Sequence, residues 1–408
     1  MLMTAEVMRT DICITGMGSI SAFGPIKGPI QQNTIPLRVI KGWPTRGLRR
    51  ACLVEPFLPS SVVPGLKTRR LDRLSVWALV ASSLALQDAQ LDLTNVARHR
   101  CGVVLGTGFG PQELTGAFCS SVAESGFSKA DAIIFPETLD NSPCCHVARI
   151  NGLTGPNITL VSRGISGEAA LIQAASILES GEADIAIAIA GDVLTQALYE
   201  YFESTGTLAS VCFDDGNIEA SGFRNWNGFV PGEGLAAFVM EKGDHYLERQ
   251  AHAYGWYRSG YTGADLTALP FSWGQNHEIV ADLMRKALGP ACSEDVRIVV
   301  SASNGSPLLD AIESEAIRNV FGASGSPRVV APKEQLGEFD ANAILRLAKA
   351  LPPLQKCESV GTISQDDGAD SGKKDSTVLQ GQLTLLLGAS TGGGRAALTF
   401  VVPQVCSL

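Results

Sequence analysis

The residues best suited to covalent chemistry lie where an apolar stretch runs through a turn into a helix. Residues 159–170 read TLVSRGISGEAA. They follow the turn signal Gly155-Pro156-Asn157 and lead into an Ala/Ile/Leu run that predicts a buried helix over 168–180. Such a turn presents its side chain to a pocket, and the helix start aims backbone N–H groups at a ligand. A covalent enzyme would carry Cys, Ser or Thr there. The residue at this position is Gly164, which has no side chain.

The bases that a nucleophile needs are scarce as well. The five histidines are His99, His146, His245, His252 and His277, so the polar turns of the last third of the chain contain no imidazole. Glu338 and Asp340 could form a carboxylate pair for acid–base work, although solvation at a helix start explains them equally well. Metalloprotease, P-loop and zinc patterns are absent from the sequence. The residues alone therefore indicate Gly-rich pocket turns without a catalytic set.

Composition excludes several classes of protein. The 408 residues are 45% hydrophobic and 18% charged, which suits a large α/β protein and not a disordered chain. A net charge of −9 without a dense Lys/Arg run argues against nucleic acid as a partner. Short basic clusters at 46–50 and 67–70 are typical of solvated surface, the alternative being docking of an acidic partner. Ten scattered cysteines without a C-x-x-C pair predict reduced thiols and no metal site. No apolar run reaches the roughly 20 residues of a membrane helix. We expect a cytoplasmic protein without a cofactor.

Strand-like and helix-like segments alternate along the whole chain, which predicts a layered α/β architecture. Strands are expected at 11–15, 101–105, 183–192, 235–241, 251–261, 296–300, 328–331, 383–387 and 396–402. Helices are expected at 70–91, 278–288, 308–321 and 340–351, and the polar residues 358–377 read as an exposed excursion. The run at 183–192 is continuously apolar, as in a strand covered on both faces.

Several of these motifs stand in the order and approximate spacing of the beta-ketoacyl-[acyl carrier protein] synthases. The closest match is NGFVPGEG at 227–234, which resembles the family's D-G-F-V-x-G-E-G. Ile14-Thr15-Gly16-Met17-Gly18, the Gly155-Pro156 turn with Ser166-Gly167, residues 184–192, residues 306–310, Lys333 and Gly392-Gly393 complete the set. The resemblance implies a thiolase-like α/β/α/β/α fold built from two similar halves, residues 1–245 and 246–408.

The departures from the family pattern fall on its catalytic residues. Aligning T-A-C-x-S-G on Ser166-Gly167 puts the nucleophile position at Gly164. Aligning H-G-T-x-T-P on Ser306-Pro307 puts the first His position at Ala302, and K-x-x-x-G-H on Lys333 puts the second at Glu338. Without a thiolate there is no acyl-enzyme, and without imidazoles nothing stabilises an enolate. The resemblance implies that the residues that form the backbone of the family's pocket are kept at Ser166, Gly167, Lys333, Gly392 and Gly393.

Ketosynthase-like subunits without the Cys resemble the chain-length factors of type II polyketide synthases. The resemblance implies a heterodimer with an active ketosynthase, an acyl carrier protein bearing the growing chain, and an interface tunnel that sets the length of an aromatic or polyene product. Candidate tunnel and interface residues are Thr107, Gly108, Phe109, Phe118, Phe135 and Leu139, for which ordinary core packing is an equal alternative. Two other functions stay open: an active condensing or acyltransfer enzyme that uses displaced residues, and an acyl-binding scaffold subunit.

Overall fold

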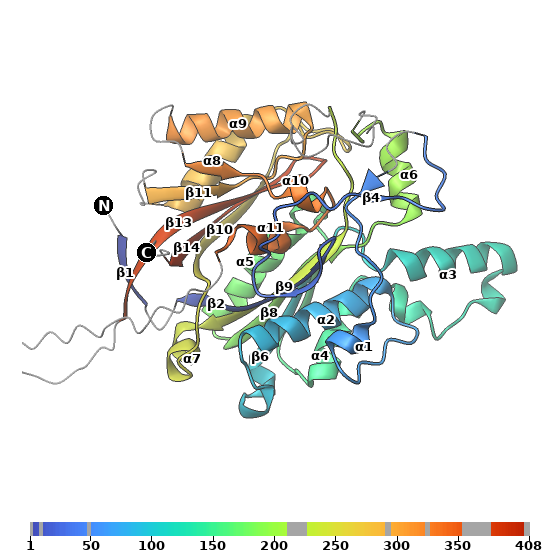
Figure 1. Ribbon diagram of the computed structural model, residues 1–408, viewed down its shortest axis with the longest axis horizontal. Helices are drawn as coiled ribbons and strands as arrows, with labels where there is room; N and C mark the ends of the chain where they lie inside the picture. Colours follow the sequence, from blue (N-terminus) through green and yellow to red (C-terminus); the bar gives the residue numbers. More distant parts are fainter. Residues whose placement is uncertain are drawn as a thin grey trace, which may run out of the picture.

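A twelve-stranded mixed sheet organises the chain (Figure 1). The computed structural model describes residues 3–7, 11–46, 50–209, 227–289, 295–322, 327–352 and 377–403. The strands are β1 (Met3–Val7), β2 (Ile12–Ser21), β3 (Gly24–Lys27), β6 (Cys101–Gly106), β7 (Asn157–Leu160), β8 (Ile185–Asp192), β9 (Gly234–Lys242), β10 (Gly255–Ala264), β11 (Val296–Val300), β12 (Arg328–Val330), β13 (Thr377–Ala389) and β14 (Gly394–Pro403). A separate two-stranded sheet pairs β4 (Arg38–Val39) with β5 (Arg50–Ala51).

The main path of the sheet runs β12-β11-β13-β14-β10-β2-β9-β8-β6-β7, with β1 paired to β13 and β3 paired to β2. Strand β6 runs parallel to both β7 and β8, whereas β8 runs antiparallel to β9. The antiparallel pair β2–β10 joins the part of the sheet that ends at β7 to the part that ends at β12. Strand β7, which leads into the Gly164 turn, is therefore an edge strand.

Helices cover both parts of the sheet and also fill the space between them. The helices are α1 (Pro59–Val62), α2 (Arg73–Asp88), α3 (Gln112–Ser125), α4 (Ser142–Asn151), α5 (Ser166–Glu179), α6 (Gln196–Ser204), α7 (Gly243–Glu248), α8 (His277–Leu288), α9 (Pro307–Phe321), α10 (Lys333–Leu336) and α11 (Ala343–Ala350). Short 3-10 turns are η1 (Leu93–Asn95), η2 (Arg98–Arg100), η3 (Phe127–Lys129), η4 (Phe135–Thr138) and η5 (Arg163–Ile165).

Three hydrophobic clusters show how these helices and strands are layered. Helices α5 and α11 share a core with inward residues of β8, β9, β13 and β14. Helices α2 and α4 pack on the outer face of β6, β8 and β9, and α8 and α9 pack on the outer face of β11, β13 and β14. The order is therefore α/β/α/β/α, which confirms the predicted fold class (Figure 1). Gly16 and Gly18 let β2 pack directly against α2, because a Cβ on Gly16 would lie 2.2 Å from the Ala85 carbonyl oxygen of α2.

Most predicted segments exist, and local backbone geometry explains where their bounds differ. The helix expected at 340–351 begins only at Ala343, because Ala341 adopts a left-handed φ of 56° that a helix cannot contain. The strand expected at 251–261 begins only at Gly255, because the Ala251 N–H still closes α7 by donating to the Tyr246 carbonyl. Residues 358–376 of the polar excursion lie outside the described residues. No helix within the described ranges is long and apolar enough to span a membrane.

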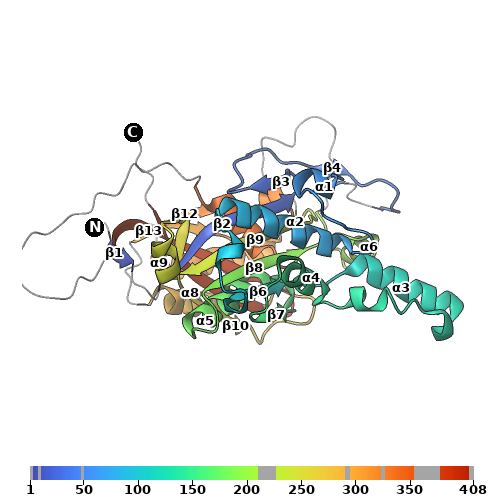
Figure 2. The same cartoon turned by 90° about the horizontal axis from the view of Figure 1, so that it is seen from below.

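An arm formed by α3, η3 and η4 projects from the body of the molecule (Figures 1 and 2). None of the residues of α3 is buried, and the Phe127 side chain in η3 is 86% exposed. The rings of Phe118 and Phe135 meet at 5.7 Å and hold the two sides of the arm together. Ile133, Phe135 and Leu139 are exposed as well, so the arm carries apolar surface that its own chain leaves open.

Candidate functional site

The turn that carries Gly164 is closed by another part of the chain. Strand β7 leads through η5 into α5, as the sequence predicts, and the Gly164 N–H donates to Ser390 Oγ at 3.1 Å. A Cβ on Gly164 would lie 2.5 Å from the Ala389 carbonyl oxygen and 3.0 Å from Ser390 Cα. Within the turn, Ser166 Oγ donates to the Arg163 carbonyl and accepts from the Ser162 N–H, each at 2.7 Å. The position that would hold a nucleophile therefore has no room for a side chain.

At the first predicted His position, Ala302 is buried in a small apolar cluster with Leu309 and Ala389. Its N–H donates to Glu313 Oε2 at 2.9 Å, and the Ser301 hydroxyl binds the other oxygen of the same carboxylate. Burial raises the pKa of Glu313. Backbone and hydroxyl donors thus bind Glu313, and Ala302 brings no titratable group to the site.

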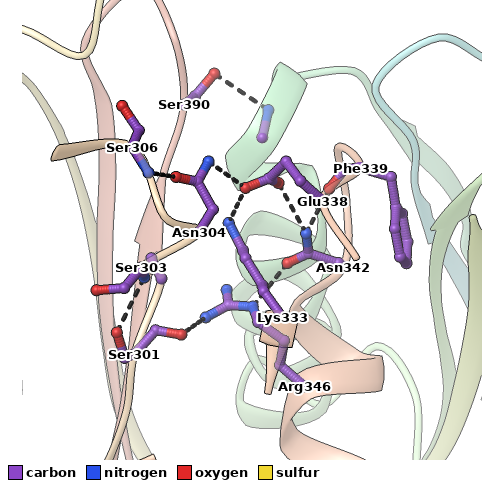
Figure 3. A network of polar contacts seen from close by, with 12 residues as sticks. Ser301, Ser303, Asn304, Ser306, Lys333, Glu338, Phe339, Asn342, Arg346 and Ser390 are labelled. Carbon is purple, nitrogen blue, oxygen red and sulfur yellow. Dashed lines mark hydrogen bonds and ion pairs between the residues drawn. The ribbon is translucent and has the colours of Figure 1, made fainter. Parts of the chain in front are cut away.

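At the second His position, three donors converge on the carboxylate of Glu338 (Figure 3). Lys333 Nζ lies 2.7 Å and Asn304 Nδ2 2.6 Å from Oε2, and Asn342 Nδ2 lies 3.2 Å from Oε1. Lys333 and Glu338 are both buried, so each charge is compensated by the other at a place where water does not solvate it. The arrangement fixes a carboxylate in place but offers no imidazole donor to an enolate.

The backbone of Glu338 connects this site to the NGFVPGEG motif. Its N–H donates to the Val230 carbonyl at 2.7 Å, and its carbonyl accepts from the Gly232 N–H at 2.9 Å. A Cβ on Gly232 would lie 2.3 Å from the Leu336 carbonyl oxygen, so only glycine permits the two segments to approach. The motif therefore positions the Glu338 loop. Residues 210–226, which precede it, lie outside the described residues.

A second buried ion pair lies beneath the site and is not expected from the sequence. Arg346 on α11 contacts Glu168 on α5, and it also donates to the carbonyls of Ser301 at 2.9 Å and Leu387 at 2.7 Å. Burial raises the pKa of Glu168, and the Arg346 guanidinium opposes that rise. The available signal is a charged residue next to an apolar run in each helix, Glu168 before Ala169-Ala170-Leu171 and Arg346 between Leu345 and Leu347. A charge at such a position requires a buried partner.

Two carboxylates hold the Thr107-Gly108-Phe109 turn from opposite sides. Asp192 accepts from the Thr107 hydroxyl at 2.6 Å and from the Gly108 and Phe109 N–H groups at 2.9 and 3.1 Å. On the other side, a Cβ on Gly108 would lie 2.3 Å from Asp340 Cβ. Burial, reinforced by Asp340, raises the pKa of Asp192 well above its ordinary range. Burial likewise raises the pKa of Asp340 to about 6.

The cavity at this site is almost filled. Its walls combine six aromatic side chains with three charged ones, namely Tyr201, Phe202, Phe229, Phe271, Trp273, Phe339, Arg163, Glu338 and Asp340. Its volume is about 40 Å³. Small-molecule sites usually measure roughly 300–1,000 Å³, so this space admits a few water molecules and no acyl chain.

The remaining predicted site residues support the cavity without lining it. A Cβ on Gly167 would lie 2.8 Å from Ala343 Cβ, so Gly167 permits close contact between α5 and α11. Gly392 and Gly393 adopt left-handed φ values of 82° and 91°, and Gly393 packs against the Asp265 carbonyl. Ser166 binds the turn and Lys333 binds Glu338, as described above. All five residues help to shape the site. Gly392 and Gly393 could not be replaced by another residue without backbone strain.

The predicted tunnel and interface residues fall into two separate groups. Thr107 and Gly108 are buried beside the site, with Phe109 partly buried next to them, whereas Phe118, Phe135 and Leu139 belong to the projecting arm. Within this chain the six residues do not form one wall. In the part of the chain that the structure describes, no group of three His, Cys, Asp or Glu residues could hold a metal ion.

Comparison with known proteins agrees with this geometry. Residues 58–245 match the beta-ketoacyl synthase N-terminal domain, and residues 270–364 match the beta-ketoacyl synthase C-terminal domain. The chain is 25% identical over 350 residues to 3-oxoacyl-[acyl-carrier-protein] synthase I, chloroplastic, of Arabidopsis thaliana, covering 81% of this chain and 72% of the relative. It is 25% identical over 343 residues to 3-oxoacyl-[acyl-carrier-protein] synthase 2 of Staphylococcus aureus, covering 80% and 81%.

Solved structures show the same fold at lower identity. The ishigamide ketosynthase/chain length factor superposes with a TM-score of 0.79 at 21% identity, covering 97% of this chain and 100% of that one. A type II polyketide synthase ketosynthase in complex with its acyl-carrier protein superposes with a TM-score of 0.76 at 18% identity, covering 96% and 99%. With both domains matched and the thiolase-like layers in place, the chain belongs to the beta-ketoacyl synthase family.

Proposed function

We propose that this chain is a non-catalytic chain-length factor, which forms a heterodimer with an active ketosynthase and shapes the tunnel that sets polyketide length. The observation that supports the proposal is that the residues at all three predicted catalytic positions are engaged in other contacts. Gly164 is closed by Ala389 and Ser390, Ala302 is packed in an apolar cluster, and Glu338 is paired with Lys333. A subunit with this site contributes shape and not chemistry.

The surface supports a partner of similar architecture. Strand β7 is the edge of the sheet, and such an edge pairs readily with a strand of another chain. Val161, at the end of β7, is about half exposed, and the projecting arm adds Phe127, Ile133, Phe135 and Leu139. One partner that covers the edge and the arm together removes both from water.

In this arrangement chain length is a steric property. The acyl carrier protein delivers the growing chain to the partner, whose Cys and His residues carry out condensation. Phe109 and its neighbours in this subunit close the far end of the interface tunnel. Because packed interiors deform little, elongation stops when the chain fills the available depth, and side-chain volume at the closed end sets the product.

Co-expression with a ketosynthase subunit, to be sought in the gene next to that of this chain, tests the proposal. We expect a one-to-one complex, with product formed from malonyl-carrier protein only when both chains are present and the partner's nucleophilic Cys is intact. Phe127→Ser should reduce co-purification, whereas Leu266→Ser is the matched control because Leu266 is equally exposed on a different loop. Product made by this chain alone, or its recovery as a stable monomer in the partner's presence, would refute the proposal.

A further inference from the structure

Arg163 stands out because of its conformation and its position. Arg163 directly precedes Gly164 and occupies the position of the alanine in the family pattern T-A-C-x-S-G. Its φ is 54°. Left-handed backbone is unusual for a long side chain and is tolerated only where surrounding contacts hold it. The backbone of the turn is therefore held in this conformation by its surroundings, while the Arg163 side chain is 43% exposed.

The contacts of Arg163 place its guanidinium at the wall of the cavity. Its central carbon lies 4.3 Å from the ring centroid of Phe109, within cation–π range, and its Nε lies 3.3 Å from Asp340 Oδ2. Asp340 is in turn wedged against Gly108, so it cannot move away without displacing the turn. The other charged groups facing this ion pair are Asp192, Glu338 and Lys333.

Apart from these charges, the cavity wall suits an acyl chain. Phe202, Phe229, Phe271 and Trp273 offer apolar surface, and Phe271 is largely exposed beside Tyr201, their rings 6.1 Å apart. What remains open is about 40 Å³, and Arg163 lines this space while its guanidinium stacks on Phe109. An alkyl chain entering here would displace the guanidinium from its aromatic and carboxylate partners and leave Asp340 beside apolar walls without its cation, which is unfavourable.

We propose that Arg163, held by Asp340 and Phe109, is a steric plug that excludes acyl chains from this subunit. This inference rests on the proposed function, because it leaves the partner as the one place where the growing chain can enter. Loss of catalytic side chains alone would leave an idle acyl pocket that competes for the chain. The plug removes that competing site.

Titration with the fluorescent fatty acid cis-parinaric acid tests the plug. The full chain is used, together with its partner where the two co-purify, so that uptake by the partner's site is the same in every sample. Wild type should show no uptake of its own, whereas Arg163→Ala should take up one further equivalent per chain. Arg163→Lys keeps a cation beside Asp340 and should stay closed. Arg149→Ala on α4, which removes an exposed arginine elsewhere, should match wild type.

Asp340→Asn provides a second route if Arg163→Ala fails to fold, because it releases the guanidinium without shortening any side chain. We expect it to take up one further equivalent of probe per chain, where wild type takes up none of its own. Wild-type stoichiometry in Arg163→Ala, or in a folded Asp340→Asn, would overturn the plug. Uptake by Arg149→Ala equal to that by Arg163→Ala would also overturn the proposal. The titration requires neither product nor heterodimer, so its failure is distinguishable from failure of the chain-length proposal.

Discussion

Replacing Gly164 by alanine tests whether the nucleophile position is closed. The added Cβ would lie 2.5 Å from the Ala389 carbonyl oxygen, and Ala389 ends β13, which is hydrogen-bonded to strands on both sides. Overpacking of this kind usually costs about 1–3 kcal/mol. Alanine also lowers the entropy of the unfolded chain, which returns about 0.4–1 kcal/mol. We therefore expect Gly164→Ala to lose about 1–2 kcal/mol of unfolding free energy.

The matched control is Gly116→Ala in the projecting helix α3, where an added Cβ would meet nothing within 4 Å. There the substitution should stabilise by about 0.5–1 kcal/mol, because glycine is unfavourable inside a helix. Denaturant midpoints at constant m-value measure both variants, with the same partner present in every sample. If Gly164→Ala were as stable as Gly116→Ala, the turn would be open and the reasoning wrong. Gly164→Cys should also leave the chain without condensation activity.

Further expectations concern the buried charges. Arg346→Met should cost about 3–5 kcal/mol, because it leaves the Glu168 carboxylate buried without a partner, and adding Glu168→Gln should recover part of that loss in a denaturation series. Hydrogen bonds and ion pairs outweigh burial and lower the pKa of Glu241 to about 2, so its contribution is present above pH 4.5 and is lost as pH falls toward 2. Glu241→Gln should therefore cost about 3 kcal/mol at pH 7 and almost nothing at pH 2, as measured by unfolding across pH. The stability contributed by Asp340 changes with pH in the opposite direction. Because its pKa is raised to about 6 in the folded chain, ionisation of Asp340 opposes folding as pH rises. Asp340→Asn should therefore be up to about 3 kcal/mol more stable than wild type at pH 8, with no difference in unfolding free energy below pH 4.

Sequence patterns predicted those parts of the fold that depend on neighbouring residues. The continuously apolar run at 183–192 became the buried strand β8, and the apolar-to-turn-to-helix pattern became β7, η5 and α5. The family alignment identified Gly164, Ala302 and Glu338 as positions to inspect, and the structure brings the surroundings of all three to one site. Hydrophobic periodicity and sequence motifs depend on neighbouring residues, so they can be recognised without knowledge of tertiary contacts.

What the sequence could not predict depends on contacts between distant residues. The Gly164 N–H binds Ser390, which is 226 positions away, and Glu168 binds Arg346, which is 178 positions away. Neither pair has a spacing that a pattern could detect. The left-handed conformation of Arg163 was equally hidden, because long side chains rarely adopt it and no glycine or turn signature marks the position.

The residues at the three predicted catalytic positions are tied to their neighbours by contacts that a single substitution would break. Restoring His at position 338 would leave the buried Lys333 ammonium without its carboxylate, and restoring Cys at position 164 would force apart the end of β13. Active sites hold unsatisfied groups at some expense in stability, and a subunit freed from catalysis can satisfy them. Each new contact makes a return to activity less accessible by a single substitution. Under the proposed function, a chain whose site had merely lost its Cys would regain activity when Cys returned, whereas this chain would require that the Ser390 turn, the Lys333 pair and the proposed Arg163 plug be rebuilt together.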